Sequence, residues 1–350
     1  MAAGTGGHIF PGLSIASEAK KNGLDVSWLG TSGGMENSIV HKHGIPIDVI
    51  CFSGIRGKGI GRAIRGFIEL ISGVFSSIKY IRSSKPDVVV GMGGYVTIPG
   101  GIAAKVLGVP LVLVNADSTL LLSNKVLAPI ASQICFGFDS SSPGNDIQGV
   151  VTGNPVREDI SGLLPPYMRY GSRKGSLRML VVGGSLGARI LNDVIPKAMS
   201  LLPLEMRPEI THQTGSGNRS EVLKSYDAAG VKANVVEFID DMSDQYKNAD
   251  IVVCRAGAIT LSELTCAGVA SILVPLIAST TVHQEANAEW LAERGGALHL
   301  PQKDFSPESL ARILASKNRS YFQSLAIEAY KYRRTHAAKS IVEILEAASK

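Results

Sequence analysis

The sequence predicts an α/β protein of two Rossmann-like domains, each built on a parallel β-sheet, with the two sheets facing a central cleft. Short apolar runs rich in β-branched residues alternate with longer amphipathic segments along the whole chain. Runs of this kind are typical of strands that are buried on both faces of a parallel sheet. The pattern occurs twice, and 350 residues exceed what one ordinary core supports.

The clearest candidates for buried strands are the runs at residues 88–90, 110–114, 179–182, 251–253 and 271–274. The first set of elements ends near Phe138 and the second begins at Leu177. Segment 161–176 has the proline, glycine and charge content that is typical of an interdomain linker. We therefore expect an N-terminal domain at 1–160 and a C-terminal domain at 161–330. The last helical pattern covers 320–348, and its end, from about 331 to 350, is expected to pack back on the first domain.

Cysteine content and hydropathy narrow the class of protein. The four cysteines are scattered and form no CxxC pair, which favours buried thiols in a reducing cytosol over a disulfide framework or a zinc site. No basic region followed by an apolar core opens the sequence. No apolar run reaches the roughly 20 residues that a membrane-spanning helix needs. We therefore expect a protein that is soluble or lies on a membrane surface.

Four glycine-rich segments precede helical patterns, and three of them directly follow predicted strands: 4–8, 91–95, 183–189 and 255–260. Backbone N–H groups of such loops, at the start of a helix, bind phosphate groups. Each segment alone is equally well explained as a tight turn, but together they favour a phosphorylated ligand. Only three residues precede the first segment, whereas a strand usually has about five. Either the start is placed too far downstream or the first strand is clipped.

The type of nucleotide can be narrowed further. The chain has no GxxxxGK[ST] segment, which excludes P-loop chemistry, and no GxGxxG followed by an acid, which disfavours NAD. Glu263 lies one turn after the last glycine segment, where its carboxylate could accept two hydrogen bonds from a ribose. The alternative is that Glu263 only interacts favourably with the dipole of the helix near its N-terminus. Segment 240–244 resembles a metal-diphosphate motif, but its place before a helix favours N-capping. With no DxD present, we expect no metal site and no cofactor, and Arg157 could neutralise a diphosphate instead.

A basic segment extends from Ser53 to Lys85, with a single acid, Glu69. Its seven basic residues are Arg56, Lys58, Arg62, Arg65, Lys79, Arg82 and Lys85. Such a segment can bind phosphates of lipid head groups or nucleic acid, but it lacks the interleaved aromatic residues of nucleic-acid modules, so no nucleic acid is expected. Apolar residues at helical spacing accompany it: Ile60, Ile64, Phe67, Ile68 and Ile71. They indicate either a helix at a membrane interface or an ordinary core-facing helix.

Nine motifs, in order along the chain, carry a resemblance to a known family. They are GTGGHIFPG (4–12), SGIRGKG (53–59), KPDVVVGMGGYVTIPGG (85–101), GNPVR (153–157), GGSLGARILN (183–192), HQTG (212–215), FIDDM (238–242), CRAGAITLSE (254–263) and HQEANA (283–288). Over essentially the whole chain the sequence resembles the MurG family of peptidoglycan N-acetylglucosaminyltransferases. That family transfers N-acetylglucosamine from UDP-N-acetylglucosamine to undecaprenyl-pyrophosphoryl-N-acetylmuramoyl-pentapeptide.

The resemblance implies the two-domain GT-B fold, with the donor in the C-terminal domain. It places Ile239 against the uracil, Ser185 at the diphosphate and Gln284 on the sugar. Around the ribose and phosphates it places Ala258, Ile259, Thr260, Leu261, Ser262 and Glu263. From the N-terminal side, and from the segment that joins the domains, the donor would be met by Thr5, Gly6, Gly7, Asp117 and Arg157.

The acceptor and the membrane would lie on the N-terminal domain, with Tyr95, Arg56, Lys58, Arg62 and Arg65 as the implied residues. The implied place is peripheral, on the cytoplasmic face of the bacterial inner membrane, with an anionic lipid surface as partner. The implied process is peptidoglycan synthesis, and through it cell shape and division.

The implied reaction is an inverting displacement, in which an acceptor hydroxyl attacks the anomeric carbon opposite UDP. The protein must remove a proton and stabilise charge on the leaving diphosphate. The helix N-termini behind Ser185 and Thr260, together with Arg157, can stabilise that charge. His8 is the candidate base, because imidazole exchanges protons near neutral pH.

Several positions depart from the family's pattern. Val114, Asn115, Ala116 and Asp117 replace the family's HEQN, and the other departures are Leu186, Ala256 and Val282. These departures keep two alternatives open, a related UDP-sugar transferase with a different acceptor and a catalytically silent UDP-sugar-binding paralogue. A UDP-N-acetylglucosamine epimerase of the same fold is disfavoured, because the motifs follow MurG.

Overall fold

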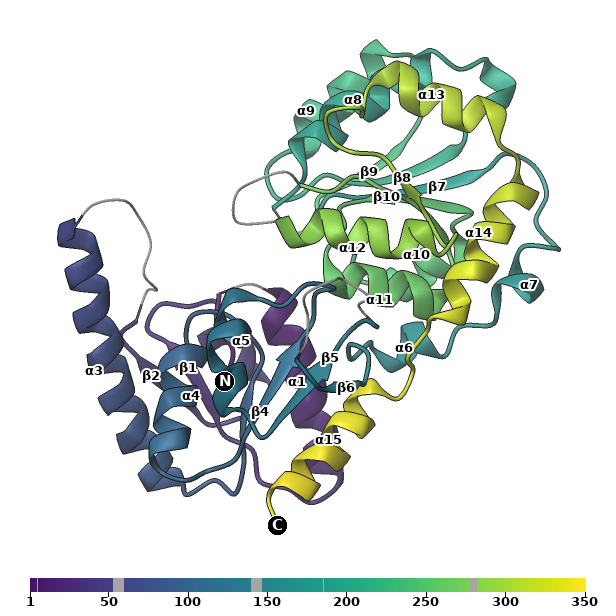
Figure 1. Cartoon of the computed structure of the whole chain (residues 1–350). Helices are drawn as coiled ribbons and strands as arrows, with labels where there is room; N and C mark the ends of the chain where they lie inside the picture. The colour runs from purple at the N-terminus through teal and green to yellow at the C-terminus, as the bar shows by residue number, and fades with distance from the viewer. Residues whose placement is uncertain (5, 53–59, 140–146, 185, 277–281) are drawn as a thin grey trace. The chain divides into compact units, whose positions relative to one another are not determined.

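The computed structural model describes residues 1–4, 6–52, 60–139, 147–184, 186–276 and 282–350, without the side chains at 60–65 and 282. The chain divides into two compact units (Figure 1). The N-terminal unit comprises Met1–Val156 and Arg334–Lys350, and the C-terminal unit comprises Arg157–Arg333. In the described residues every pair of neighbouring strands is parallel, which agrees with the α/β class expected from the sequence.

The N-terminal unit contains two parallel sheets, one of order β1-β2 and one of order β3-β4-β5-β6. Its strands are β1 (Trp28–Thr31), β2 (Ile47–Ile50), β3 (Val89–Gly91), β4 (Leu111–Asn115), β5 (Gln133–Phe136) and β6 (Val150–Val151). Its helices are α1 (Gly6–Lys21), α2 (Glu36–Lys42), α3 (Ile60–Ser84), α4 (Thr97–Val106), α5 (Leu122–Leu127), the 3-10 turn η1 (Ala128–Ile130) and α15 (Ala337–Ala348).

The C-terminal unit contains one sheet of order β12-β11-β10-β7-β8-β9. Its strands are β7 (Arg178–Val182), β8 (Glu209–Gln213), β9 (Asn234–Val236), β10 (Ile251–Cys254), β11 (Ala270–Leu273) and β12 (Leu298–His299). Its helices are α6 (Glu158–Ser161), α7 (Pro166–Arg169), α8 (Arg189–Ser200), the 3-10 turn η2 (Leu204–Met206), α9 (Arg219–Ala228), α10 (Met242–Asn248), α11 (Ala258–Ala267), α12 (Val282–Glu293), α13 (Pro307–Ser316) and α14 (Arg319–Lys331).

Helices cover both faces of this sheet, with α8, α9 and α13 on one face and α10, α11 and α12 on the other (Figure 1). The strand order reverses between β7 and β10, which is the arrangement of a doubly wound sheet. In such sheets ligands bind beyond the carboxyl ends of the strands, next to this reversal.

The five predicted strands are confirmed as β3, β4, β7, β10 and β11, with bounds shifted by a residue or so. In β4, β10 and β11 every residue is buried, as expected for continuous apolar runs between two layers of helices. β9, which precedes segment 240–244, covers only Asn234–Val236.

Segment 161–176 is not a linker, so that interpretation was wrong. It contains α7 and belongs to the C-terminal unit, which begins at Arg157. The buried Arg169 donates hydrogen bonds to the carbonyl oxygens of Tyr246 (3.0 Å) and Gly268 (2.7 Å). The hydroxyl of Tyr170 donates to the carbonyl of Asp250 at 2.9 Å. Arg169 and Tyr170 therefore anchor α7 on the C-terminal unit.

The helical pattern at 320–348 forms two helices, α14 and α15, where one continuous helix was expected. The chain passes into the N-terminal unit at Arg334, and α15 then packs against α1. Ile341, Val342 and Leu345 of α15 share one apolar core with Ile9 and Leu13 of α1. The last part of the chain thus completes the N-terminal core.

Candidate active site

In the C-terminal unit, the loops that follow β7 and β8 touch each other through their backbones. Gly187 (φ 78°) and Gly215 (φ 82°) adopt the left-handed conformation that favours glycine. A Cβ on Gly187 would collide with the carbonyl oxygen of Thr214, and a Cβ on Gly215 would collide with the Gly187 backbone. This close approach explains why both the GGSLGA and the HQTG segments contain glycine.

A buried network of polar side chains, His212, Tyr226 and Asn192, supports these two loops. His212 Nδ1 lies 2.9 Å from the hydroxyl of Tyr226, and His212 Nε2 lies 3.1 Å from Oδ1 of Asn192. Asn192 in turn donates to the carbonyl of Thr214 at 3.2 Å. Burial lowers the pKa of His212 to about 4, so the imidazole is neutral at pH 7. With Nε2 donating to Asn192 and Nδ1 accepting from Tyr226, His212 supports the loops as a neutral side chain.

Several helices of this unit begin without a capping side chain, and α8 and α11 are two of them. Ala188 precedes α8 and Gly257 precedes α11, and neither provides a side-chain hydrogen bond to the first turn. The N–H groups of a helix's first turn, together with the helix dipole, make a binding site for anions. Both helix N-termini follow strands that are neighbours in the sheet, β7 and β10.

The residues predicted around the ribose and phosphates, at 258–263, form the start of α11. The side chain of Leu261 is fully buried, so only its main chain can meet a ligand. The hydroxyl of Ser262 donates to the carbonyl of Ala258 at 3.0 Å, and both residues are buried. Ile259 and Thr260 are partly exposed and can contribute side chains as well as main chain.

Glu263 is paired with a tyrosine that the sequence did not single out. The hydroxyl of Tyr246 donates to Oε2 of Glu263 at 3.0 Å. Burial raises the pKa of Glu263, while the hydrogen bond from Tyr246 and the charge of Arg157 act in the opposite direction. The pKa of Tyr246 lies well above its usual range because of burial and the neighbouring Glu263 charge. The hydrogen bond from Tyr246 fixes the orientation of the Glu263 carboxylate on α11.

The start of α12 is tied to the loops after β10 and β11. Oε1 of Gln284 accepts from the N–H of Leu276 at 3.0 Å, and Nδ2 of Asn287 donates to the carbonyl of Ala256 at 3.1 Å. Arg255 donates to the carbonyl of Val274 at 3.0 Å. Asn287 and Arg255 lie in the motifs HQEANA and CRAGAITLSE, but the residue pattern gave no role for either.

Segment 240–244 is an N-cap, as expected. Oδ1 of Asp241 accepts from the N–H of Asp244 at 2.8 Å at the start of α10. Ile239, expected against the uracil, lies just before this cap and is buried, while its neighbour Phe238 is exposed.

In the N-terminal unit, His8 lies in the first turn of α1, and α1 begins with Gly6 and Gly7. The loop after β3 packs closely on it. Gly93 (φ 90°) and Gly94 (φ 79°) have positive φ, and a Cβ on Gly93 would lie 3.1 Å from Nε2 of His8 and 3.1 Å from Leu121. Gly93 of the loop after β3 thus lies next to both His8 of α1 and Leu121 of the loop after β4.

The loop after β4 is held by three asparagines, Asn115, Asn124 and Asn154. Nδ2 of Asn115 donates to the carbonyl of Asp117 at 2.8 Å, and its Oδ1 accepts from the N–H of Leu121 at 2.9 Å. Asn124 donates to the carbonyl of Val114 at 3.1 Å, and Asn154 donates to the carbonyl of Ala116 at 2.9 Å. The network positions the buried Asp117 and places Leu121 beside Gly93.

The first glycine segment is anchored by a buried acid. Glu36 accepts from the N–H (2.9 Å) and hydroxyl (2.7 Å) of Thr31 and from the N–H of Gly4 (3.4 Å). Tyr95, expected on the acceptor side, lies against Gly4 and packs edge-on against Phe52 with the ring centroids 6.2 Å apart. Thr5, Ser185, Arg56 and Lys58 lie outside the described residues, and for Arg62 and Arg65 only the course of α3 is described.

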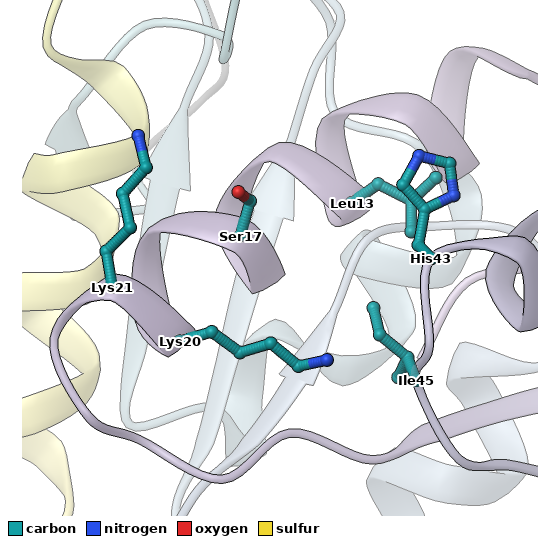
Figure 2. A pocket seen from close by; sticks show the side chains of 6 residues that line it. All are labelled: Leu13, Ser17, Lys20, Lys21, His43 and Ile45. Carbon is teal, nitrogen blue, oxygen red and sulfur yellow. The ribbon is translucent and has the colours of Figure 1, made fainter.

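A separate hollow of about 380 Å³ lies at the far end of α1 (Figure 2). It is lined by Leu13, Ser17, Lys20, Lys21, His43 and Ile45. Lys20 donates to the carbonyl of Gly44 at 3.0 Å. Lysines in the last turn of a helix are stabilised by the negative end of its dipole, which explains these cations without a ligand.

Comparison with known proteins first defines the class. Residues 1–136 match the glycosyltransferase family 28 N-terminal domain, and residues 178–343 match the family's C-terminal domain. The fold is similar to that of the S. aureus MnaA-UDP co-structure, with a TM-score of 0.64 and 13% identity, covering 97% of this chain and 93% of that chain. The fold is therefore the two-domain GT-B type, as expected.

More similar proteins define the family. The chain is 51% identical to the UDP-N-acetylglucosamine--N-acetylmuramyl-(pentapeptide) pyrophosphoryl-undecaprenol N-acetylglucosamine transferase of Herminiimonas arsenicoxydans, over 99% of this chain and 97% of the relative. It is 44% identical to the protein of the same name from Ralstonia nicotianae, over 100% of this chain and 96% of the relative. The crystal structure of Acinetobacter baumannii MurG superposes on this structure with a TM-score of 0.88 and 34% identity. The match covers 99% of this chain and 98% of that chain. The chain belongs to the MurG family of glycosyltransferases.

Proposed function

We propose that the protein transfers N-acetylglucosamine from UDP-N-acetylglucosamine to the undecaprenyl-pyrophosphoryl-linked N-acetylmuramoyl-pentapeptide, the step from lipid I to lipid II in peptidoglycan synthesis. The observation that carries this proposal is that α8 and α11, which follow the neighbouring strands β7 and β10, have uncapped N-termini, and that the Tyr246–Glu263 pair joins α10 to α11. It occurs in a chain that is 51% identical over nearly its full length to a relative named for this reaction.

The donor site follows from the C-terminal unit. The N-termini of α8 and α11 supply N–H groups to the diphosphate, with Arg157 as an added positive charge. Glu263 accepts hydrogen bonds from the ribose hydroxyls, and the Tyr246 hydroxyl fixes the orientation of its carboxylate. Ile239 contacts the uracil, Ser185 the diphosphate and Gln284 the sugar. We further propose that Thr5, Gly6, Gly7 and Asp117 also contact the donor.

The reaction is a single displacement at the anomeric carbon. The acceptor hydroxyl forms the new C–O bond while the bond from the anomeric carbon to the UDP oxygen breaks, so the configuration inverts. His8 receives the hydroxyl proton, and the helix N-termini stabilise the negative charge that develops on the leaving diphosphate. The packing of Gly93 on the His8 ring supports this role, because it restricts the imidazole to a fixed position.

The membrane contact follows from α3. One face of this helix is buried and carries Ser77 and Ile81, while an opposite set of large apolar side chains is exposed. The exposed set comprises Phe67 (59%), Ile68 (61%), Ile71 (42%) and Phe75 (69%). Full burial of such a side chain contributes about 1.5–3 kcal/mol, so removing the exposed half from water is worth roughly 1 kcal/mol each.

The basic residues at the start of the same helix would add attraction to an anionic leaflet. We propose that the protein is peripheral, at the cytoplasmic face of the inner membrane, with α3 at the lipid surface. No helix in the described part of the chain has the length and hydropathy needed to cross a membrane.

A transfer assay with matched donors and acceptors tests the proposed function. The purified protein is incubated with labelled UDP-N-acetylglucosamine, UDP-N-acetylgalactosamine or UDP-glucose, and with either a short-chain muramoyl-pentapeptide lipid or the same lipid without the peptide. We expect turnover with the first donor and the complete acceptor. Turnover only with another lipid would show a transferase of different acceptor, and donor binding without any turnover would show a silent paralogue.

A further inference from the structure

Three side chains for which the sequence predicted no role converge at the edge of the C-terminal sheet. Glu285 and Glu289 lie four residues apart on α12, and therefore on one face of this helix. His299 lies on the edge strand β12, which is in contact with α12. One ligand atom from each of the three residues lies within 4.8 Å of the other two.

The geometry between Glu285 and His299 does not fit an ordinary hydrogen bond. Oε1 of Glu285 lies 3.1 Å from Nε2 of His299, yet Nε2 has no hydrogen-bond partner among the described residues. Oε2 of Glu285 likewise has none there, and both atoms are shielded from solvent. Two ligands that each lie about 2.1 Å from one ion are roughly 3 Å apart, with their lone pairs directed at the ion and not at each other.

A simple ion pair accounts for only two of the three groups. It would pair Oε1 of Glu285 with His299, but it leaves Oε2 of Glu285 without a partner among the described residues and the carboxylate of Glu289 within 4.8 Å of another carboxylate. Two carboxylates at this distance repel each other unless a positive charge lies between them. A divalent cation would satisfy both carboxylates and the imidazole together.

We propose that Glu285, Glu289 and His299 form a binding site for a zinc-class divalent cation. One imidazole nitrogen and two carboxylates are ligands that Zn²⁺ prefers, and three protein ligands leave a fourth position for water. Ca²⁺ and Mg²⁺ prefer oxygen ligands only, in larger number. This site is separate from the cysteines and from segment 240–244.

The site would fasten a weakly held strand. β12 has two residues and pairs with β11 only at Leu298 and His299. An ion shared with Glu285 and Glu289 would join this edge strand to the first half of α12, where Gln284 bonds the backbone at Leu276. Bound metal stabilises only the folded chain, so it raises the midpoint of thermal unfolding.

The test uses the full-length protein after removal of metal with a chelator. Zn²⁺ affinity is measured by competition with a chromophoric chelator, and thermal unfolding is recorded with and without Zn²⁺. We expect one strong site per chain and a higher midpoint with Zn²⁺. Glu289→Gln and His299→Asn should each weaken this site tenfold or more and abolish the rise in midpoint. Glu293→Gln, an exposed acid on the same helix, should behave as wild type.

Glu289 is exposed, so its substitution should leave the metal-free fold intact, which circular dichroism checks. If Glu289→Gln and His299→Asn bind Zn²⁺ as tightly as Glu293→Gln, the cation binds at other histidines and the proposal is wrong. Absence of a strong site in the wild-type protein would also overturn it.

Discussion

Acidification should destabilise the C-terminal unit through His212. Burial lowers the pKa of His212 from 6.5 to about 4 in the folded chain, so the unfolded chain binds this proton more tightly. Protonation therefore favours unfolding as the pH falls from 6.5 towards 4, and the stability that the neutral imidazole provides is fully present above 6.5. These two values give a loss of about 2 kcal/mol between pH 7 and pH 5 from this one side chain.

Urea unfolding of the full-length protein at pH 7 and pH 5 measures this loss, with far-UV circular dichroism as the signal. His212→Gln removes the titrating group and should reduce the pH-dependent difference by about 2 kcal/mol, whatever it costs at pH 7. His41→Gln, at an exposed histidine, is the matched control and should keep the wild-type difference. Equal losses between pH 7 and pH 5 for wild type and His212→Gln would refute the reasoning.

Three further outcomes follow from the structure. Glu263→Ala should weaken UDP-N-acetylglucosamine binding by about 1–3 kcal/mol in calorimetry without added Mg²⁺, because a partly buried hydrogen-bond partner of the donor is lost. Unchanged affinity would contradict the donor site. Phe67→Ser with Phe75→Ser should reduce sedimentation with anionic vesicles while donor affinity stays constant, and wild-type sedimentation would place the membrane contact elsewhere. Gly187→Ala should lower the free energy of unfolding more than Gly217→Ala. Both glycines have positive φ, but a Cβ would collide with the carbonyl oxygen of Thr214 only at Gly187, so equal losses would contradict the backbone contact.

The sequence was most informative where burial is uniform. β4, β10 and β11 are continuous apolar runs because both faces of the sheet are covered, so their positions were visible without a structure. β8 was not singled out, because Glu209–Gln213 contains polar residues. His212 of this strand is nevertheless fully buried, and its hydrogen bonds to Tyr226 and Asn192 satisfy it there.

The candidate site was predicted in its backbone more than in its supporting side chains. Glycine segments after strands marked the loops at β7 and β10, because a phosphate site needs close approach of N–H groups. Tyr246 and Asn115 could not be found this way. Tyr246 contacts Glu263 because α10 packs on α11. Asn115 donates to the carbonyl of Asp117 in a turn that no sequence pattern predicts. The linker predicted at 161–176 from composition was wrong, because Arg169 bonds to Tyr246 and Gly268, which lie far along the chain.

The structure of the reaction product tests the central claim most directly. Purified protein is incubated with UDP-N-acetylglucosamine and a short-chain lipid-linked muramoyl-pentapeptide, and the product is examined by mass spectrometry and by NMR at the anomeric carbon. The account predicts a product heavier by one N-acetylglucosamine, joined with the anomeric configuration opposite to that of the donor. A lipid recovered unchanged, or a product that retains the donor's configuration, would contradict it.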